Sequence, residues 1–171
     1  STVYNAVKNS MEIGIWMLNV HAAGGGEMLK AASSAIESSE KKPILLGVTL
    51  LTSLNKGSLR EIGFGSDVEV ESLVIRFAKL CRSKGLDGVV CSPQEIKSLR
   101  KEIGKDFVLV TPGIRSNQIV GDDQKRTTSP SKALREGADY IVVGREVTLD
   151  NNPSEKVRQI LENIPKQTLN N

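Results

Sequence analysis

Five short apolar runs recur along the chain, and amphipathic segments separate them. Runs of this length that are rich in valine, leucine and isoleucine predict strands that are buried on both faces. The predicted strands cover residues 15–21, 44–51, 86–91, 107–114 and 140–143. Apolar residues at helical spacing predict one helix before the first strand, over residues 2–13, and a helical segment after each strand.

Signals at helix starts support three of these helices. Ser66 with Glu69, and Ser92 with Glu95, match the capping box, in which a serine and a glutamate three residues later accept from each other's backbone N–H groups. Ser129 precedes a proline, which is favoured at the first helical position. The sequence therefore predicts strict alternation of strands and helices, which is typical of a parallel sheet.

Such alternation fits either an open doubly wound sheet or part of a (β/α)8 barrel. Polar residues and glycines gather at the C-terminal ends of all five predicted strands, which favours the barrel. No glycine-rich dinucleotide fingerprint follows the first strand. A complete barrel takes about 250 residues. We therefore expect residues 1–171 to form one domain, the C-terminal two-thirds of a barrel with about five of its eight β/α units, and an N-terminal portion to be missing.

The last two predicted strands end in a similar way. The run over residues 107–115 ends in Pro-Gly-Ile-Arg, and the run over residues 140–145 ends in Gly-Arg. Glycine lets the backbone approach a ligand closely, and a guanidinium group suits a dianion such as phosphate. Either arginine alone could equally be a surface residue after a turn. Two of them at equivalent strand ends favour a phosphate site that contains Arg115 and Arg145.

Composition narrows the class of protein. The chain has 171 residues, 39% hydrophobic and 25% charged, with a net charge of +3 and only 4% aromatic residues. Basic and acidic residues alternate, so we expect neither a nucleic-acid nor a membrane surface. No apolar run approaches the roughly 18 residues that span a bilayer. Cys81 and Cys91 lie in apolar segments, which predicts two reduced core thiols in a cytoplasmic protein, and the single histidine argues against zinc.

Six motifs, in order along nearly the whole chain, resemble orotidine 5′-phosphate decarboxylase of the bacterial type. The most characteristic are residues 111–115, 123–126 and 143–145, and the others are residues 19–22, 48–53 and 86–92. The resemblance implies a (β/α)8 barrel that acts as a homodimer without cofactor or metal. It also implies conversion of orotidine 5′-phosphate (OMP) to UMP and CO2 in pyrimidine biosynthesis.

The resemblance also implies roles for individual residues. The 5′-phosphate would be held by Arg115, Gln124, Gly144 and Arg145. The pyrimidine and its neighbouring loop would face Thr52 and Ser53, while Thr2 would close a long substrate-binding segment. Two features depart from the family pattern: Glu146 stands where proline is common, and the loop over residues 116–123 is individual to this sequence. A loop of this length could close over the substrate, or it could simply be a polar loop.

One departure concerns the chemistry itself. The family's catalytic Asp-x-Lys-x-x-Asp array does not occur in this chain, and the resemblance places it upstream of Ser1. In the family that lysine meets the carbanion formed as CO2 leaves. Lys8, Lys56 and Lys125 are poor substitutes, because none lies among carboxylates at the end of a core strand. We therefore expect this chain to carry the phosphate- and pyrimidine-binding half of the mechanism and no catalytic residue.

Two other functions fit parts of the sequence. Another sugar-phosphate barrel, such as a hexulose-phosphate synthase or an epimerase, would also bind phosphate on its last two strands, but the Pro-Gly-Ile-Arg and Asp-Gln-Lys-Arg pair argues against it. A non-catalytic fragment that only binds phosphate or a partner chain would explain the missing array. His21 lies at a predicted strand end, where a lone histidine is more often structural than catalytic.

Overall fold

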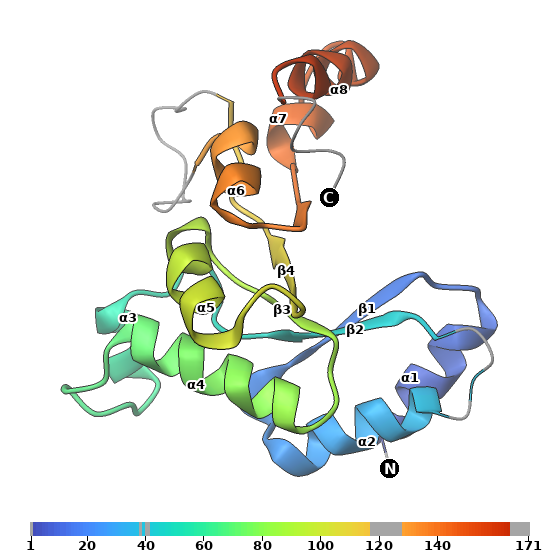
Figure 1. Cartoon of the computed structure of the whole chain (residues 1–171), viewed down its shortest axis with the longest axis vertical. Helices are drawn as coiled ribbons and strands as arrows, with labels where there is room; N and C mark the ends of the chain where they lie inside the picture. The colour runs from blue at the N-terminus through green and yellow to red at the C-terminus, as the bar shows by residue number, and fades with distance from the viewer. Residues whose placement is uncertain (1, 38, 40–41, 117–127, 165–171) are drawn as a thin grey trace.

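The computed structural model describes residues 2–37, 39, 42–116 and 128–164 (Figure 1). Strands and helices alternate along these residues as predicted. The strands are β1 (Met17–His21), β2 (Ile44–Val48), β3 (Gly88–Val90), β4 (Val108–Thr111) and β5 (Tyr140–Ile141). The α-helices are α1 (Thr2–Glu12), α2 (Gly26–Glu37), α3 (Lys56–Glu61), α4 (Val70–Ser83), α5 (Ile96–Ile103), α6 (Pro130–Glu136), α7 (Arg145–Thr148) and α8 (Pro153–Glu162). Two 3-10 turns, η1 (Ala22–Gly24) and η2 (Pro93–Glu95), complete the described elements.

The five strands form one parallel sheet in the order β1-β2-β3-β4-β5. Each strand therefore lies beside its neighbour in sequence, with no point at which the order reverses. A doubly wound sheet contains such a reversal, because its helices must cover both faces. Sequential order with helices on one side is the arrangement of the wall of a barrel. All five predicted strands are present, although β2 ends at Val48, before the predicted residue 51.

The two faces of the sheet have different surroundings. The helices cover the convex face, where Leu18, Leu45, Val89 and Leu109 join the main hydrophobic core (Figure 1). Neighbouring residues along each strand point to the concave face, because side chains alternate along a strand. One row on that face, defined by the strand register, consists of His21, Val48, Val90, Val110 and Tyr140.

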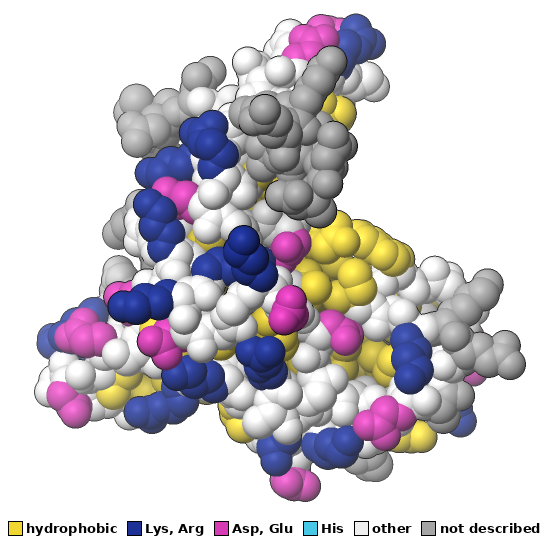
Figure 2. Space-filling model, in the orientation of Figure 1, with side chains coloured by type: hydrophobic (Ala, Val, Ile, Leu, Met, Phe, Trp, Pro, Cys, Tyr) yellow, Lys and Arg dark blue, Asp and Glu magenta, His cyan; other side chains and the backbone are white. Residues whose placement is uncertain are grey.

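Hydrophobic side chains gather in the hollow on the concave side (Figure 2). Trp16, just before β1, is 62% exposed, and its ring meets that of Tyr140 in β5 edge-on, with centroids 5.2 Å apart. Aromatic pairs in this geometry contribute about 0.5–1.5 kcal/mol beyond the area they bury. The pair therefore links the two outer strands of the described sheet near their amino ends.

The structure confirms two of the three predicted helix starts. The capping box of Ser92 and Glu95 is present, with the Ser92 backbone N–H donating to Glu95 Oε2 at 2.8 Å, and Ser129 caps α6. The capping box predicted at Ser66 is wrong, because α4 begins only at Val70. The Glu69 side chain pairs instead with Lys56, and a turn occupies residues 65–68.

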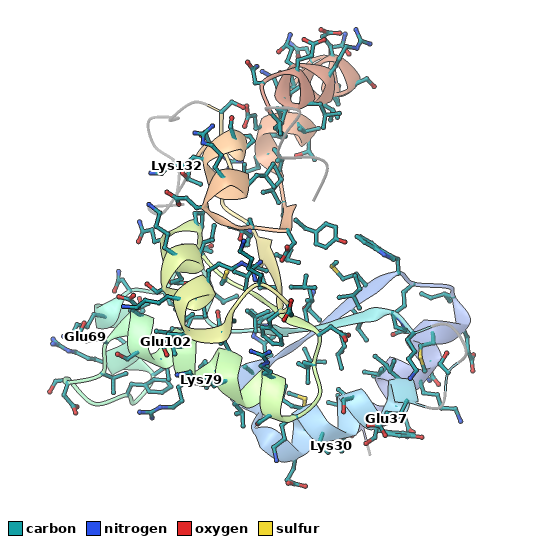
Figure 3. All side chains as sticks on the ribbon, viewed as in Figure 1. Lys30, Glu37, Glu69, Lys79, Glu102 and Lys132 are labelled. Atoms are coloured by element: carbon teal, nitrogen blue, oxygen red, sulfur yellow. The ribbon has the colours of Figure 1, made fainter. Side chains whose placement is uncertain are left out.

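Exposed ion pairs lie on the outer surface of the helices. Lys30 pairs with Glu37 along α2, and Lys79 of α4 pairs with Glu102 of α5 (Figure 3). Such solvent-exposed pairs contribute little to stability, with typical values of about 0–1 kcal/mol. No helix among the described residues is long and apolar enough to cross a membrane.

A repeated Gly-x-Asp segment connects helix ends to strand starts. Asp87, before β3, donates its backbone N–H to the Leu45 carbonyl at 2.9 Å, and its carboxylate accepts the Leu45 N–H at 2.8 Å. Asp139, before β5, makes the same two bonds to Leu109, at 3.0 and 2.7 Å. Each aspartate therefore extends the ladder by one rung and sets the register of two strands. Asp139 also pairs with Arg100 at 2.6 Å.

We expect Asp139→Ala to lower the free energy of unfolding by about 1–3 kcal/mol, because it leaves the Leu109 N–H without its acceptor. Asp139→Asn keeps an acceptor oxygen and should cost about 1 kcal/mol or less, mainly the partly exposed pair with Arg100. Urea denaturation measures both effects. Asp106→Ala is the control at an exposed aspartate. Equal losses for the alanine and asparagine variants would show that the charge, and not the backbone contact, stabilises this joint.

Candidate substrate-binding site

The predicted site residues follow the carboxyl ends of parallel strands. Carboxyl ends of parallel strands meet at one edge of the sheet, which is where barrels bind their ligands. Thr52 and Ser53 follow β2, Arg115 follows β4, and Gly144 and Arg145 follow β5. Strands β4 and β5 are direct neighbours, with Val110 opposite Tyr140 and Thr111 opposite Ile141. Both arginines therefore leave the sheet from adjacent positions.

Arg115 is held firmly. Only 6% of the residue is exposed, so it is not a surface side chain after a turn. Its backbone N–H donates to the Thr128 carbonyl at 3.0 Å, and the Thr128 N–H donates to the Gly113 carbonyl at 3.3 Å. These two bonds form an isolated parallel bridge between Ile114 and Thr128. Burying a charge is costly unless polar groups surround it, so the position of Arg115 is specified by its surroundings and not by solvent.

Gly144 and Arg145 form the turn that starts α7. The Gly144 carbonyl accepts from the backbone N–H groups of Val147 and Thr148, at 2.9 and 3.1 Å. A Cβ atom added to Gly144 would meet nothing within 4 Å, so this turn borders open space. Arg145 itself is exposed. The two arginines thus differ, because Arg115 is buried and Arg145 is exposed.

A side-chain contact joins the two strand ends. Glu146, directly after Arg145, is half-buried, and its Oε2 accepts the backbone N–H of Ser116 at 2.8 Å. Ser116 directly follows Arg115. The residues after β4 are thereby bound to the first turn of α7 after β5. Neither this role of Glu146 nor that of Thr128 was predicted, since both depend on contacts between segments that are distant in sequence.

The other predicted site residues are less closely associated with the ends of β4 and β5. Thr52 is half-buried and Ser53 is exposed, both in the turn after β2, which lies two strands from β4 in the sheet. Thr2 is the exposed first residue of α1, a helix that packs against α2. Gln124 and residues 117–123 of the loop that could close over the substrate lie outside the described residues. The structure therefore places Arg115, Gly144 and Arg145 after neighbouring strands, and the binding role of every predicted site residue stays a prediction.

Both cysteines are buried and free, as predicted. Burial raises the pKa of Cys91 to about 12, with Glu95 adding to the shift, and burial raises the pKa of Cys81 to about 11. Both thiols are therefore protonated at neutral pH and are poor nucleophiles. Among the described residues, no group of three or more His, Cys, Asp or Glu side chains could hold a metal ion.

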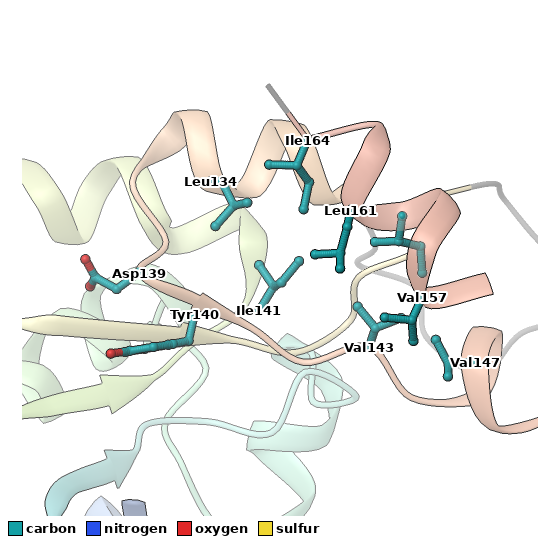
Figure 4. A pocket seen from close by; sticks show the side chains of 10 residues that line it. Leu134, Asp139, Tyr140, Ile141, Val143, Val147, Val157, Leu161 and Ile164 are labelled. Carbon is teal, nitrogen blue, oxygen red and sulfur yellow. The ribbon is translucent and has the colours of Figure 1, made fainter. Parts of the chain in front are cut away.

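A cavity of about 390 Å³ lies on the side of β5 that faces α6 and α8, with lining residues from Asp139, before the strand, to Val147 of α7, after it (Figure 4). Ile141 of β5, Leu134 of α6 and Ile160 of α8 contribute to its lining, which is apolar apart from the Asp139 and Tyr140 side chains. Leu161, also in the lining, is 53% exposed. Because the described lining residues include no cationic side chain, they do not suit phosphate.

Comparison with known proteins identifies the family that this chain matches. A model of the orotidine 5′-phosphate decarboxylase / HUMPS family matches residues 1–160. An orotidine 5′-phosphate decarboxylase of Neisseria meningitidis serogroup C is 48% identical over 161 residues, which are 93% of this chain and 64% of the relative. The corresponding protein of Actinobacillus succinogenes is 47% identical over 161 residues, or 94% of this chain and 68% of the relative. This chain thus spans about two-thirds of the length of these relatives.

Solved structures agree with the sequence comparison. The crystal structure of orotidine 5′-phosphate decarboxylase from Lactobacillus acidophilus superposes with a TM-score of 0.80 at 36% identity, and the match covers 99% of this chain and 70% of that one. An uncharacterized conserved protein from Geobacillus kaustophilus gives 0.77 at 31% identity, covering 94% and 69%. The predicted partial (β/α)8 barrel is confirmed. With this fold, and with the family model matching nearly all of its length, the chain belongs to the orotidine 5′-phosphate decarboxylase / HUMPS family.

Proposed function

We propose that this chain forms the phosphate- and pyrimidine-binding part of an orotidine 5′-phosphate decarboxylase. The observation that carries the proposal is the pair of arginines after adjacent strands, Arg115 buried after β4 and Arg145 after β5, in a chain about 48% identical to proteins of that name. The reaction breaks the bond between C6 of the pyrimidine and the carboxylate carbon. The electron pair remains on C6 and takes up a proton, which gives UMP and CO2.

Two guanidinium groups match the double negative charge of the 5′-phosphate. Arginine suits phosphate because its planar fork can donate two hydrogen bonds at once. The phosphate lies far from the reacting carbon, yet its binding energy can lower the barrier by fixing the geometry of the substrate. Under this proposal Gly144 leaves room for the phosphate oxygens, because the space where its side chain would stand is open.

The remaining assignments rest on the resemblance alone. Gln124 would contribute to the phosphate site, Thr52 and Ser53 would face the pyrimidine, and Thr2 would close the substrate-binding segment. The same resemblance supports a cytoplasmic homodimer that needs no cofactor, acts on OMP and releases UMP. A DNA, RNA or membrane partner has no place in this proposal.

An assay of the complete natural protein that contains this sequence tests the proposal. Decarboxylation of OMP changes the ultraviolet absorbance of the pyrimidine, so turnover can be followed directly. We expect enzymatic turnover without added metal, and we expect UMP to inhibit. If the protein fails to act on OMP but catalyses aldol chemistry on a hexulose phosphate, the family membership would stand and the assignment of the reaction would be wrong.

A further inference from the structure

We propose that Glu146 is a positioning residue for the phosphate site, which holds the main chain after β4 against the turn after β5. The inference rests on the proposed function, since it assigns a role within the same site. Glu146 Oε2 accepts the Ser116 backbone N–H at 2.8 Å. This side-chain contact joins Ser116, the residue after Arg115, to Glu146, the residue after Arg145.

Backbone bonds on both sides of Arg115 support this role. Before it, the Gly113 carbonyl accepts the Thr128 N–H, and at Arg115 the backbone N–H donates to the Thr128 carbonyl. After it, the next backbone N–H, that of Ser116, donates to Glu146. The main chain around Arg115 is thus restrained at three successive points. Two of these restraints come from Thr128. The third connects the segment after β4 to α7.

The position of Glu146 in α7 transmits the restraint to Arg145. Glu146 is the second residue of a four-residue helix, and the Gly144 carbonyl, directly before that helix, accepts from the backbone N–H groups of its last two residues, Val147 and Thr148. These two bonds close the turn that carries Arg145 and Glu146. The hydrogen bond from Ser116 therefore restrains the segment after Arg115 relative to this turn.

The charge of Glu146 works against the binding of a dianion, because like charges repel. A carboxylate so close to a candidate phosphate site therefore requires a compensating contribution, and the accepted hydrogen bond provides it. The two effects can be separated by substitution. Glu146→Gln keeps an acceptor oxygen and removes the charge, whereas Glu146→Ala removes both. A positioning role and a purely electrostatic role predict different orders for these variants.

The experiment uses the complete protein and compares Glu146→Ala, Glu146→Gln and the control Glu155→Ala. Glu155 is also an acidic residue in the first turn of a helix, but it belongs to α8 and pairs with Arg158. We expect Glu146→Ala to raise KM for OMP about 3- to 30-fold, because a hydrogen bond to a charged acceptor is lost, with kcat reduced less. Glu146→Gln should restore KM to within about threefold of the parent, and Glu155→Ala should change nothing.

Two comparisons decide the outcome. Turnover of orotidine, which lacks the phosphate, should be unaffected in all three variants. An equal loss on orotidine and OMP in Glu146→Ala would overturn the proposal, since the residue would then be structural. Equal effects of alanine and glutamine would also overturn it, since charge alone would be responsible.

A readout without catalysis separates this inference from the proposed function. Hydrogen exchange at the Ser116 amide should accelerate at least about tenfold in Glu146→Ala and stay slow in Glu146→Gln. Inorganic phosphate should bind more weakly to the alanine variant than to the glutamine variant in calorimetry. If the protein binds phosphate in this way but does not decarboxylate OMP, only the proposed reaction fails. Unchanged exchange at Ser116 would overturn the role of Glu146 whatever the reaction.

Discussion

A polypeptide of these 171 residues alone will not decarboxylate OMP at an enzymatic rate. The chain contains no Asp-x-Lys-x-x-Asp array, and preorganised charge of that kind is usually the largest single contribution to catalysis. Phosphate binding by Arg115 and Arg145 can orient the substrate, but it places no ammonium group beside C6. We expect the rate to fall to the uncatalysed background in an ultraviolet assay of purified protein whose intact mass matches these residues.

Two of the three lysines considered as substitutes for the missing ammonium group are described, and Lys125 lies outside the described residues. Lys8 is exposed on α1, and Lys56 pairs with Glu69 at the protein surface. The complete protein, assayed in parallel, is the positive control. Robust turnover by the 171-residue polypeptide would show that the catalytic group has been misplaced and lies within this chain.

Replacement of Arg145 by alanine in the complete protein should lower kcat/KM for OMP by about 10- to 1,000-fold or somewhat more. A charge-assisted hydrogen bond contributes ~1.5–3 kcal/mol, and a guanidinium can donate two of them to one phosphate. Each 1.36 kcal/mol corresponds to a factor of ten. Steady-state kinetics with OMP measure the effect. Arg158→Ala is the matched control, because Arg158 is an exposed arginine on α8 that pairs with Glu155.

The phosphate of the substrate provides a second test of Arg145. On orotidine, which carries no phosphate, the loss should nearly vanish, because the guanidinium then has no ligand to bind. If Arg145→Ala lost the same factor on orotidine and on OMP, Arg145 would be structural and the phosphate assignment at this strand end would be wrong. Calorimetry with UMP should show a parallel weakening of binding.

Local pattern was sufficient for most of the secondary structure. Strands β1 to β5 fall within the five predicted apolar runs. The predicted burial on both faces fits β2 and β4, but it is wrong for β1 and β5, which contain exposed residues. The start of α4 was the exception. Ser66 and Glu69 have the right spacing for a capping box, but Glu69 pairs with Lys56, and the helix begins at Val70, three residues later than a Ser66 cap implies. A contact between distant segments overrode the local signal.

The candidate site, too, could be predicted only in part from the sequence. Two arginines after predicted strands could be recognised in the sequence, and strict alternation implied that their strands were parallel. The burial of Arg115 could not be recognised in the sequence, because it depends on Thr128 and on the neighbouring strands. Glu146 was visible only as a departure from a family pattern, and its bond to Ser116 crosses from one strand end to the next.

The sequence by itself thus determined the identity and order of the elements, the arginines at two strand ends and the absence of the lysine–carboxylate array, since each of these is a property of consecutive residues. Only the tertiary structure decided the sequential strand order, the meeting of Trp16 with Tyr140, and the restraint of Arg115 by Thr128 and Glu146. The physical reason is that hydrogen bonds and burial between distant segments depend on where the chain folds back, and a pattern with a period of two or 3.6 residues carries no information about the partner.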